Sequence, residues 1–156
     1  MEKVELIKQQ ELSNRLMYFL KGDCNAVKMC MDLTYIAHLW DDLIDKDRAR
    51  SDTDINDAFR LALVEIPMNP FYRKFSFDLS PLFLNTILQW EDANVLESAE
   101  EHDKDMAYML RASFLQIFNY CAFLIGGPLW AREIGPDMRR LYAEPLNSFK
   151  EEMNNA

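Results

Sequence analysis

The sequence predicts an all-α protein, a single-domain helical bundle of five main helices with short C-terminal helices that spans residues 1–156. Three observations lead to this fold class. Apolar residues recur at helical spacing, the chain has only 4 glycines, and little of it alternates between apolar and polar as strands do. Hydrophobic residues make up 49% of the chain and charged residues 28%, which argues against disorder, and a chain of 156 residues is typical of one domain.

The expected helices follow one another with short connections. We place the main helices at residues 2–20, 25–46, 52–66, 80–98 and 103–125, and shorter ones at 129–133 and 136–142, before a polar tail. The first helix carries an apolar face that includes Leu16, Phe19 and Leu20, and the Lys-Gly-Asp run at 21–23 stops it. The third begins at 52–54, where small polar residues can cap its free N–H groups.

Proline and glycine mark the later boundaries. The Ser-Pro pair at 80–81 combines a hydroxyl cap with proline at the first helical position, so we expect the fourth helix to begin there. We expect residues 68–79 to form a packed loop, because its aromatic side chains need burial. The Gly-Gly-Pro run at 126–128 closes the fifth helix. The second and fifth helices are apolar around nearly their whole circumference, so we expect them to be central and the most buried.

Four acids in seven residues end the second helix, in the sequence Asp41-Asp42-Leu43-Ile44-Asp45-Lys46-Asp47. On a helical wheel, the side chains of His38, Asp41, Asp42 and Asp45 fall within an arc of about 100°. Packing several carboxylates together costs energy unless a cation or a basic partner compensates them. The pattern therefore predicts a site on this face, with His38 as a metal ligand or an ion-pair partner.

The pentad at 41–45 resembles the Asp-Asp-x-x-Asp motif of class I isoprenoid synthases, all-helical enzymes that bind prenyl diphosphate through magnesium ions. Oxygen ligands one turn apart suit Mg²⁺, which in turn holds diphosphate oxygens. The resemblance implies that Asp41, Asp42 and Asp45 are metal ligands and that the cofactor is Mg²⁺.

A second metal site is implied on another helix by the same resemblance. In terpene cyclases this site reads Asn-x-x-x-Ser-x-x-x-Glu. Asn94 and Ser98 match its first two positions, whereas position 102 is histidine and Glu101 stands beside it.

The pentad at 41–45 also resembles the Glu-Glu-x-x-Glu element of all-helical nucleotide pyrophosphohydrolases, with Asp in place of Glu. In that family a Glu-x-x-Asp element on the next helix completes the Mg²⁺ site, and Glu100-x-x-Asp103 matches it. Both resemblances imply magnesium and a diphosphate group.

An acid also interrupts the apolar stripe of the fourth helix. The stripe reads Leu84, Ile87, Leu88, Glu91 and Val95, and Asp92 follows the acid. Arg111 likewise interrupts the longest apolar run, where an unpaired guanidinium would cost several kcal/mol. We therefore expect Arg111 to form a buried ion pair, or to receive a phosphate or carboxylate ligand. The expected partners are Asp41, Asp42, Asp45, Glu91 and Asp92.

Two functions remain open on these grounds. The first is a Mg²⁺-dependent protein that acts on or binds a diphosphate-containing ligand through the acidic helix. The second is a small, acidic, non-enzymatic helical protein with an interaction, regulatory or structural role, as in viral or bacterial accessory proteins. In that interpretation the acids mark the emergence of a buried helix into solvent, and Arg48, Arg50 and Arg73 pair with them.

Charge and hydropathy narrow the expected partners. A formal charge of −9 speaks against a nucleic-acid binder, because no basic stripe offsets phosphate repulsion. The apolar segment 106–125 contains polar residues such as Arg111 and Gln116, which argues against a lone membrane span. We expect a cytoplasmic protein with free thiols, whose partner is a small phosphorylated ligand or another protein. A homo-oligomer is compatible with the composition.

Overall fold

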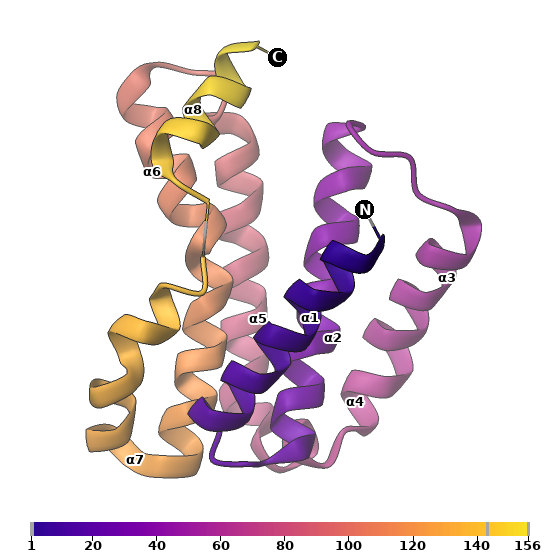
Figure 1. Cartoon of the computed structure of the whole chain (residues 1–156), viewed down its shortest axis with the longest axis vertical. Helices are drawn as coiled ribbons and strands as arrows, with labels where there is room; N and C mark the ends of the chain where they lie inside the picture. Colours follow the sequence, from indigo (N-terminus) through magenta and orange to yellow (C-terminus); the bar gives the residue numbers. More distant parts are fainter. Residues whose placement is uncertain (1, 143, 156) are drawn as a thin grey trace. The chain divides into compact units, whose positions relative to one another are not determined.

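The computed structural model describes residues 2–142 and 144–155, with side chains from residue 8 onward (Figure 1). The fold is 86% helix and has no strand in the described residues, which confirms the all-α prediction. The α-helices are α1 (Glu2–Phe19), α2 (Cys24–Asp45), α3 (Asp52–Arg60), α4 (Ile66–Met68), α5 (Pro70–Leu96), α6 (Glu101–Arg111), α7 (Leu115–Arg139) and α8 (Leu146–Asn155). A π-helical turn, Leu61–Glu65, joins α3 to α4, and a 3₁₀ turn, Ala112–Phe114, joins α6 to α7. The helix count therefore differs from the expected five main helices.

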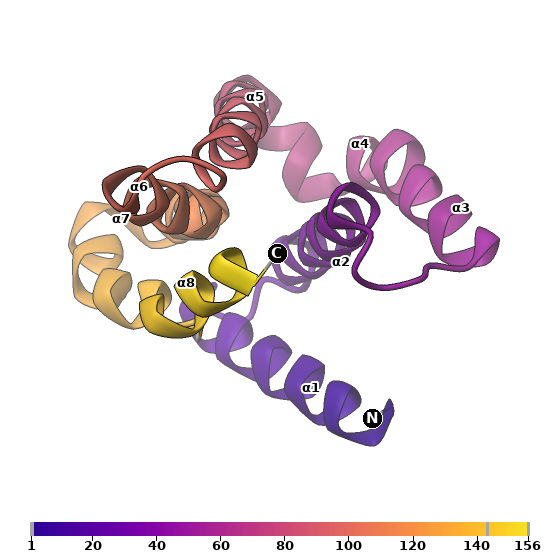
Figure 2. The same cartoon turned by 90° about the horizontal axis from the view of Figure 1, so that it is seen from above.

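The chain divides into two compact units, Met1–Ser76 and Phe77–Ala156. In the first unit, α2 lies between α1 and the α3–α4 segment (Figure 2). The turn from α1 into α2 is the expected one, since Lys21 and Gly22 adopt positive φ angles. Asp23 then caps α2, and its carboxylate accepts a hydrogen bond from the backbone N–H of Ala26 at 2.9 Å.

The core of the first unit is built from α1 and the first half of α2. Its fully buried side chains include Leu16, Leu20, Met29 and Cys30. The expected apolar face of α1 is thus confirmed at Leu16, Phe19 and Leu20. We expected α2 to be among the most buried helices, and its C-terminal end departs from this, since Leu43 and Ile44 are each 42% exposed.

Asn69 starts α5 earlier than expected. Its side-chain oxygen accepts hydrogen bonds from the backbone N–H groups of Phe71 (2.9 Å) and Tyr72 (3.3 Å). Its amide nitrogen donates to the carbonyl of Asn25 at 2.9 Å, so the cap is also tied to the start of α2. The sequence Asn69-Pro70 therefore carries the cap-then-proline signal that we assigned to 80–81. The expected loop at 68–79 is wrong, and Pro81 lies inside α5.

Gly127 breaks α7 as the sequence predicts. Its φ of 81° and ψ of −179° belong to a backbone conformation that residues other than glycine rarely adopt. A Cβ on the preceding Gly126 would lie 2.4 Å from Cδ1 of Trp130, so glycine also permits the close approach of that ring. Beyond the break the chain stays helical to Arg139, which corrects the two short helices expected at 129–133 and 136–142.

The expected polar tail instead forms α8, which packs on α6. Phe149 is buried together with Ala93 of α5 and Ala107 of α6, and Met153 lies against this cluster. Lys150 forms an ion pair with Asp105 of α6 at 2.5 Å. A short amphipathic helix thus closes one end of the second unit, where α8 and α6 lie side by side (Figures 1 and 2).

Only one stretch of the described residues, Glu101–Arg139, is apolar enough to cross a membrane by length and composition, and an 18-residue window within it has a mean hydropathy of 1.3. It contains α6, the 3₁₀ turn and α7 in series, and the backbone leaves helical geometry again at Gly127. An unbroken membrane-spanning helix needs about 20 residues, and α6 has 11.

Candidate functional site

The acidic end of α2 is closed by an ion pair. Both Nε and Nη2 of Arg50 donate to Oδ2 of Asp42, and the two side chains are only 14% and 16% exposed. The helix ends at Asp45, and Lys46 adopts the left-handed conformation with its N–H donating to the carbonyl of Asp42. The basic partner that the sequence called for at Asp42 is therefore an arginine from the following loop.

The other residues expected at this site lie on the same helix end. His38 and Asp45 are exposed, and Asp41 is half-buried. Among the residues that the structure describes, no group of three or more His, Cys, Asp or Glu side chains is arranged to hold a metal ion.

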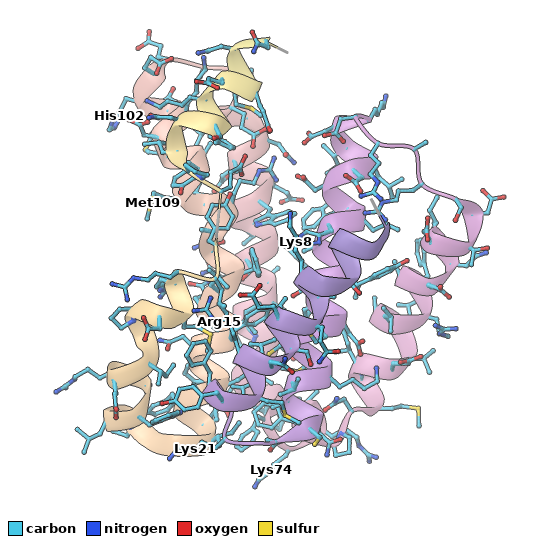
Figure 3. All side chains as sticks on the ribbon, viewed as in Figure 1. Lys8, Arg15, Lys21, Lys74, His102 and Met109 are labelled. Carbon is cyan, nitrogen blue, oxygen red and sulfur yellow. The ribbon has the colours of Figure 1, made fainter. Side chains whose placement is uncertain are left out.

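The acidic and polar residues that we expected on and after the fourth predicted helix do not form one site. Glu91 and Asp92 are exposed on α5. The hydroxyl of Ser98 donates to the carbonyl of Val95, and the side chain of Asn94 accepts a hydrogen bond from Arg111. Glu101 forms an ion pair with Lys150 of α8 at 3.1 Å. Hydrogen bonds from Lys150 lower the pKa of Glu101, which marks this acid as an anchor for α8. The neighbouring His102 and Met109 project from the outer side of α6 (Figure 3).

Arg111 forms the buried ion pair that its position requires, although with an acid that we did not expect. Its Nε donates to Oε1 of Glu97 at 2.6 Å, and the side chains are 8% and 11% exposed. Its Nη2 donates to Oδ1 of Asn94, and the guanidinium lies 5.1 Å from the ring centroid of Trp90. Glu97 is not among the five acids that we expected as partners, which were Glu91, Asp92, Asp41, Asp42 and Asp45.

The partner differs because the buried face of α5 is the opposite one from the face we expected. Leu79, Thr86, Trp90, Ala93 and Glu97 share one side of the helix, and the first four are buried. The stripe that we took for the core turns outward, and Glu91 and Asp92 turn outward with it. A helix with an apolar stripe on each side does not reveal from sequence which side packs inward.

The inner face of α5 is held against α6 and α7 along most of its length. Four contacts run antiparallel along the two segments: Asp78 with Tyr120 (3.2 Å), Thr86 with Gln116 (3.2 Å), Trp90 with Phe114 (6.5 Å between ring centroids), and Glu97 with Arg111. Gln116 also donates to Gln89 at 3.3 Å. These directional contacts fix the rotation of α5 and therefore which face it presents outward.

The outer face of α5 carries exposed apolar side chains aligned along one side of the helix. They are Phe77 (96% exposed), Leu84 (58%), Leu88 (48%) and Val95 (72%), which we call the outer stripe. The spacings of 7, 4 and 7 residues keep these side chains on one side of a helix, over about 27 Å of its axis. Large apolar side chains gathered on one exposed face of a monomer commonly mark an interaction site.

Exposed acids border the outer stripe. We call Glu91 and Asp92 the acidic rim; both are exposed. From Phe75 to Asp103 the chain contains seven acids and neither lysine nor arginine. The second unit as a whole has 13 acids against 6 lysines and arginines, so it carries a formal charge of −7 of the total −9.

A second cluster of ionisable groups lies beyond the end of α7. The hydroxyl of Tyr142 donates to Oε2 of Glu144 at 3.3 Å, and the hydroxyl of Tyr108 donates to the Glu144 carbonyl at 2.7 Å. Burial, together with the nearby Glu152 and Glu97, raises the pKa of Glu144, and burial beside Glu144 raises the pKa of Tyr142. The hydrogen bond from Tyr108 holds α6 against the segment that leads into α8.

Comparisons with known proteins give no match to this chain among protein-family models, curated protein sequences or solved structures. The two family resemblances of the acidic motifs therefore stay predictions. Sequence reasoning noticed the residues of the outer stripe but assigned most of them to the core, and it missed Glu97. The signal for Glu97 was present, because Trp90, Ala93 and Glu97 follow the i, i+3, i+7 spacing of one helix face.

Proposed function

We propose that this chain is a non-enzymatic helical interaction protein that binds a partner protein on the outer stripe of α5. The observation that carries the proposal is the stripe itself, four large apolar side chains that are each about half exposed or more on a helix whose other face is already packed. Exposed apolar side chains lose contact with water when a partner covers them, which is the main driving force of protein association.

The rigidity of α5 supports the same function. The buried Arg111–Glu97 pair and the contacts of Gln116 hold the inner face in one rotation, so the outer stripe is preorganised before any partner arrives. A preorganised surface loses less conformational entropy on binding than a flexible one. Arg111 in this account is a structural residue that positions the binding face and does not itself contact the partner.

Photo-crosslinking in the cells that express the chain tests the proposal. A benzophenone amino acid at position 88 lies in the outer stripe, whereas the same group at position 129 replaces a leucine that is 75% exposed on α7. We expect position 88 to give one protein adduct of defined mass, and Leu84→Asn in the same chain to abolish it. Equal adduct patterns at 88 and 129 would contradict a specific binding face.

A further inference from the structure

We infer that the occupant of the outer stripe is an amphipathic helix of a partner protein whose apolar face is flanked by lysine and arginine. This inference rests on the proposed function, and it adds the shape and the charge of the partner.

The shape of the partner follows from the alignment of the stripe residues on one side of α5. Phe77, Leu84, Leu88 and Val95 form a single row along about 27 Å of helix axis, which matches about five turns of a second helix. Two helices bury such rows by interlocking side chains at i, i+3, i+4 and i+7 positions, a common mode of peptide recognition.

The charge of the partner follows from the acidic rim. Glu91 and Asp92 are exposed on α5 beside the stripe and lie on opposite sides of it on a helical wheel. A helix that covers the stripe places its own flanking residues next to these carboxylates. Lysine and arginine at those positions gain opposite-charge contacts and faster association, whereas acids there meet like charge.

The same charges disfavour a second copy of this chain as the occupant. A dimer through the outer stripe would bring together two units that each carry a formal charge of −7. It would also place the rim of one copy beside the rim of the other, because a two-fold interface uses the same patch twice. Like-charge contacts of this kind oppose association and weaken only with added salt.

A displayed peptide library tests the inference with the whole chain as bait. The library holds 18-residue helices with leucine fixed at i, i+3, i+4 and i+7 spacing and with the flanking positions randomised among Lys, Arg, Glu, Gln and Ser. The chain variants are Leu84→Asn/Leu88→Asn for the stripe and Glu91→Lys/Asp92→Lys for the rim. Their matched controls are Leu129→Asn and Glu133→Lys, both at exposed positions of α7.

We expect selection to enrich lysine and arginine at the flanks. The enriched peptides should bind about tenfold more weakly to the rim variant, since each exposed charge pair contributes a few tenths of a kcal/mol and reversal adds repulsion. They should bind about 30-fold more weakly to the stripe variant, which loses two apolar contacts. Neither control variant should change the affinity by more than about twofold.

The possible outcomes distinguish a failure of the basic helix from a failure of the interaction function. Enriched peptides that need the stripe but show no charge bias, or that bind the rim variant equally well, would overturn the basic helix and leave the interaction function standing. Peptides that bind the stripe variant as well as the wild type would overturn both. Sedimentation measurements could instead show a dimer of the chain that Leu88→Asn converts to monomers. A second copy would then occupy the stripe, and the basic helix would be wrong.

Discussion

Truncation of Glu97 should destabilise the protein strongly, because it leaves the Arg111 guanidinium buried without its carboxylate. The two side chains are 8% and 11% exposed and 2.6 Å apart, so little water reaches either of them. Removing one partner of a buried ion pair costs about 3–5 kcal/mol. Asn94 still accepts a hydrogen bond from Arg111, and the Trp90 ring retains a cation–π contact of about 0.5–2 kcal/mol. We therefore expect Glu97→Ala to cost about 3 kcal/mol, the low end of that range.

Urea and thermal denaturation followed by circular dichroism measure this cost. A loss of about 3 kcal/mol lowers the melting temperature of a chain of this size by about 6–12 °C. Glu91→Ala is the matched control, since Glu91 is exposed on the same helix, and it should cost less than about 0.5 kcal/mol. The double variant Arg111→Met/Glu97→Leu should recover most of the loss, because apolar side chains replace buried ion pairs at little net cost. Equal losses for Glu97→Ala and Glu91→Ala, or a double variant no better than the added single effects, would refute the buried pair.

Three further predictions concern the other parts of the chain. Gly127→Ala should lower the free energy of unfolding, measured in urea, by about 2–3 kcal/mol, because Gly127 combines a φ of 81° with a ψ of −179°. The loss should exceed that of Gly22→Ala. A loss equal to or smaller than that of Gly22→Ala would show that an alanine at the break is not strained. Millimolar Mg²⁺ should shift the melting temperatures of wild type and Asp42→Asn equally, because Arg50 already compensates Asp42; a stabilisation that vanishes in Asp42→Asn would favour the magnesium function instead. Burial raises the pKa of Glu144 above 4.5, so the folded state holds this proton more tightly than the unfolded state, and the stability from this group is lost as the pH rises through the raised pKa. Glu144→Gln should therefore be more stable than wild type at neutral pH, with a difference that shrinks in acid, and a difference independent of pH would contradict this assignment.

Local signals in the sequence predicted local structure well. The glycines at 126–127 interrupt a helix, and the stop after Leu20 and the start near residue 52 lie where the sequence placed them. Each of these boundaries depends on the conformational limits of a few neighbouring residues. The start of α5 was missed because the Asn-Pro pair at 69–70 and the Ser-Pro pair at 80–81 carry the same signal, and only the contact of Asn69 with Asn25 distinguishes the first.

The faces of α5 illustrate what local signals leave open. The cost of a buried guanidinium predicted that Arg111 has an acidic partner, and that requirement holds whatever the fold. Which acid serves depends on the rotation of α5, and contacts of residues far away in sequence, such as Thr86 with Gln116, set that rotation. For the same reason an apolar stripe that binds a partner resembles one that packs into a core.

The accessibility of position 88 inside and outside the cell tests the proposed function most directly. In a Cys24→Ser background, which removes the exposed native thiol, Leu88→Cys and Leu129→Cys place single reporters in the outer stripe and on α7. Maleimide labelling rates are then measured in the purified protein and in intact cells that express it. The account predicts that both thiols react readily in the purified protein, and that in cells only the thiol at 88 is protected, at least tenfold more than the one at 129. Equal labelling at the two positions in cells would contradict a partner on the outer stripe.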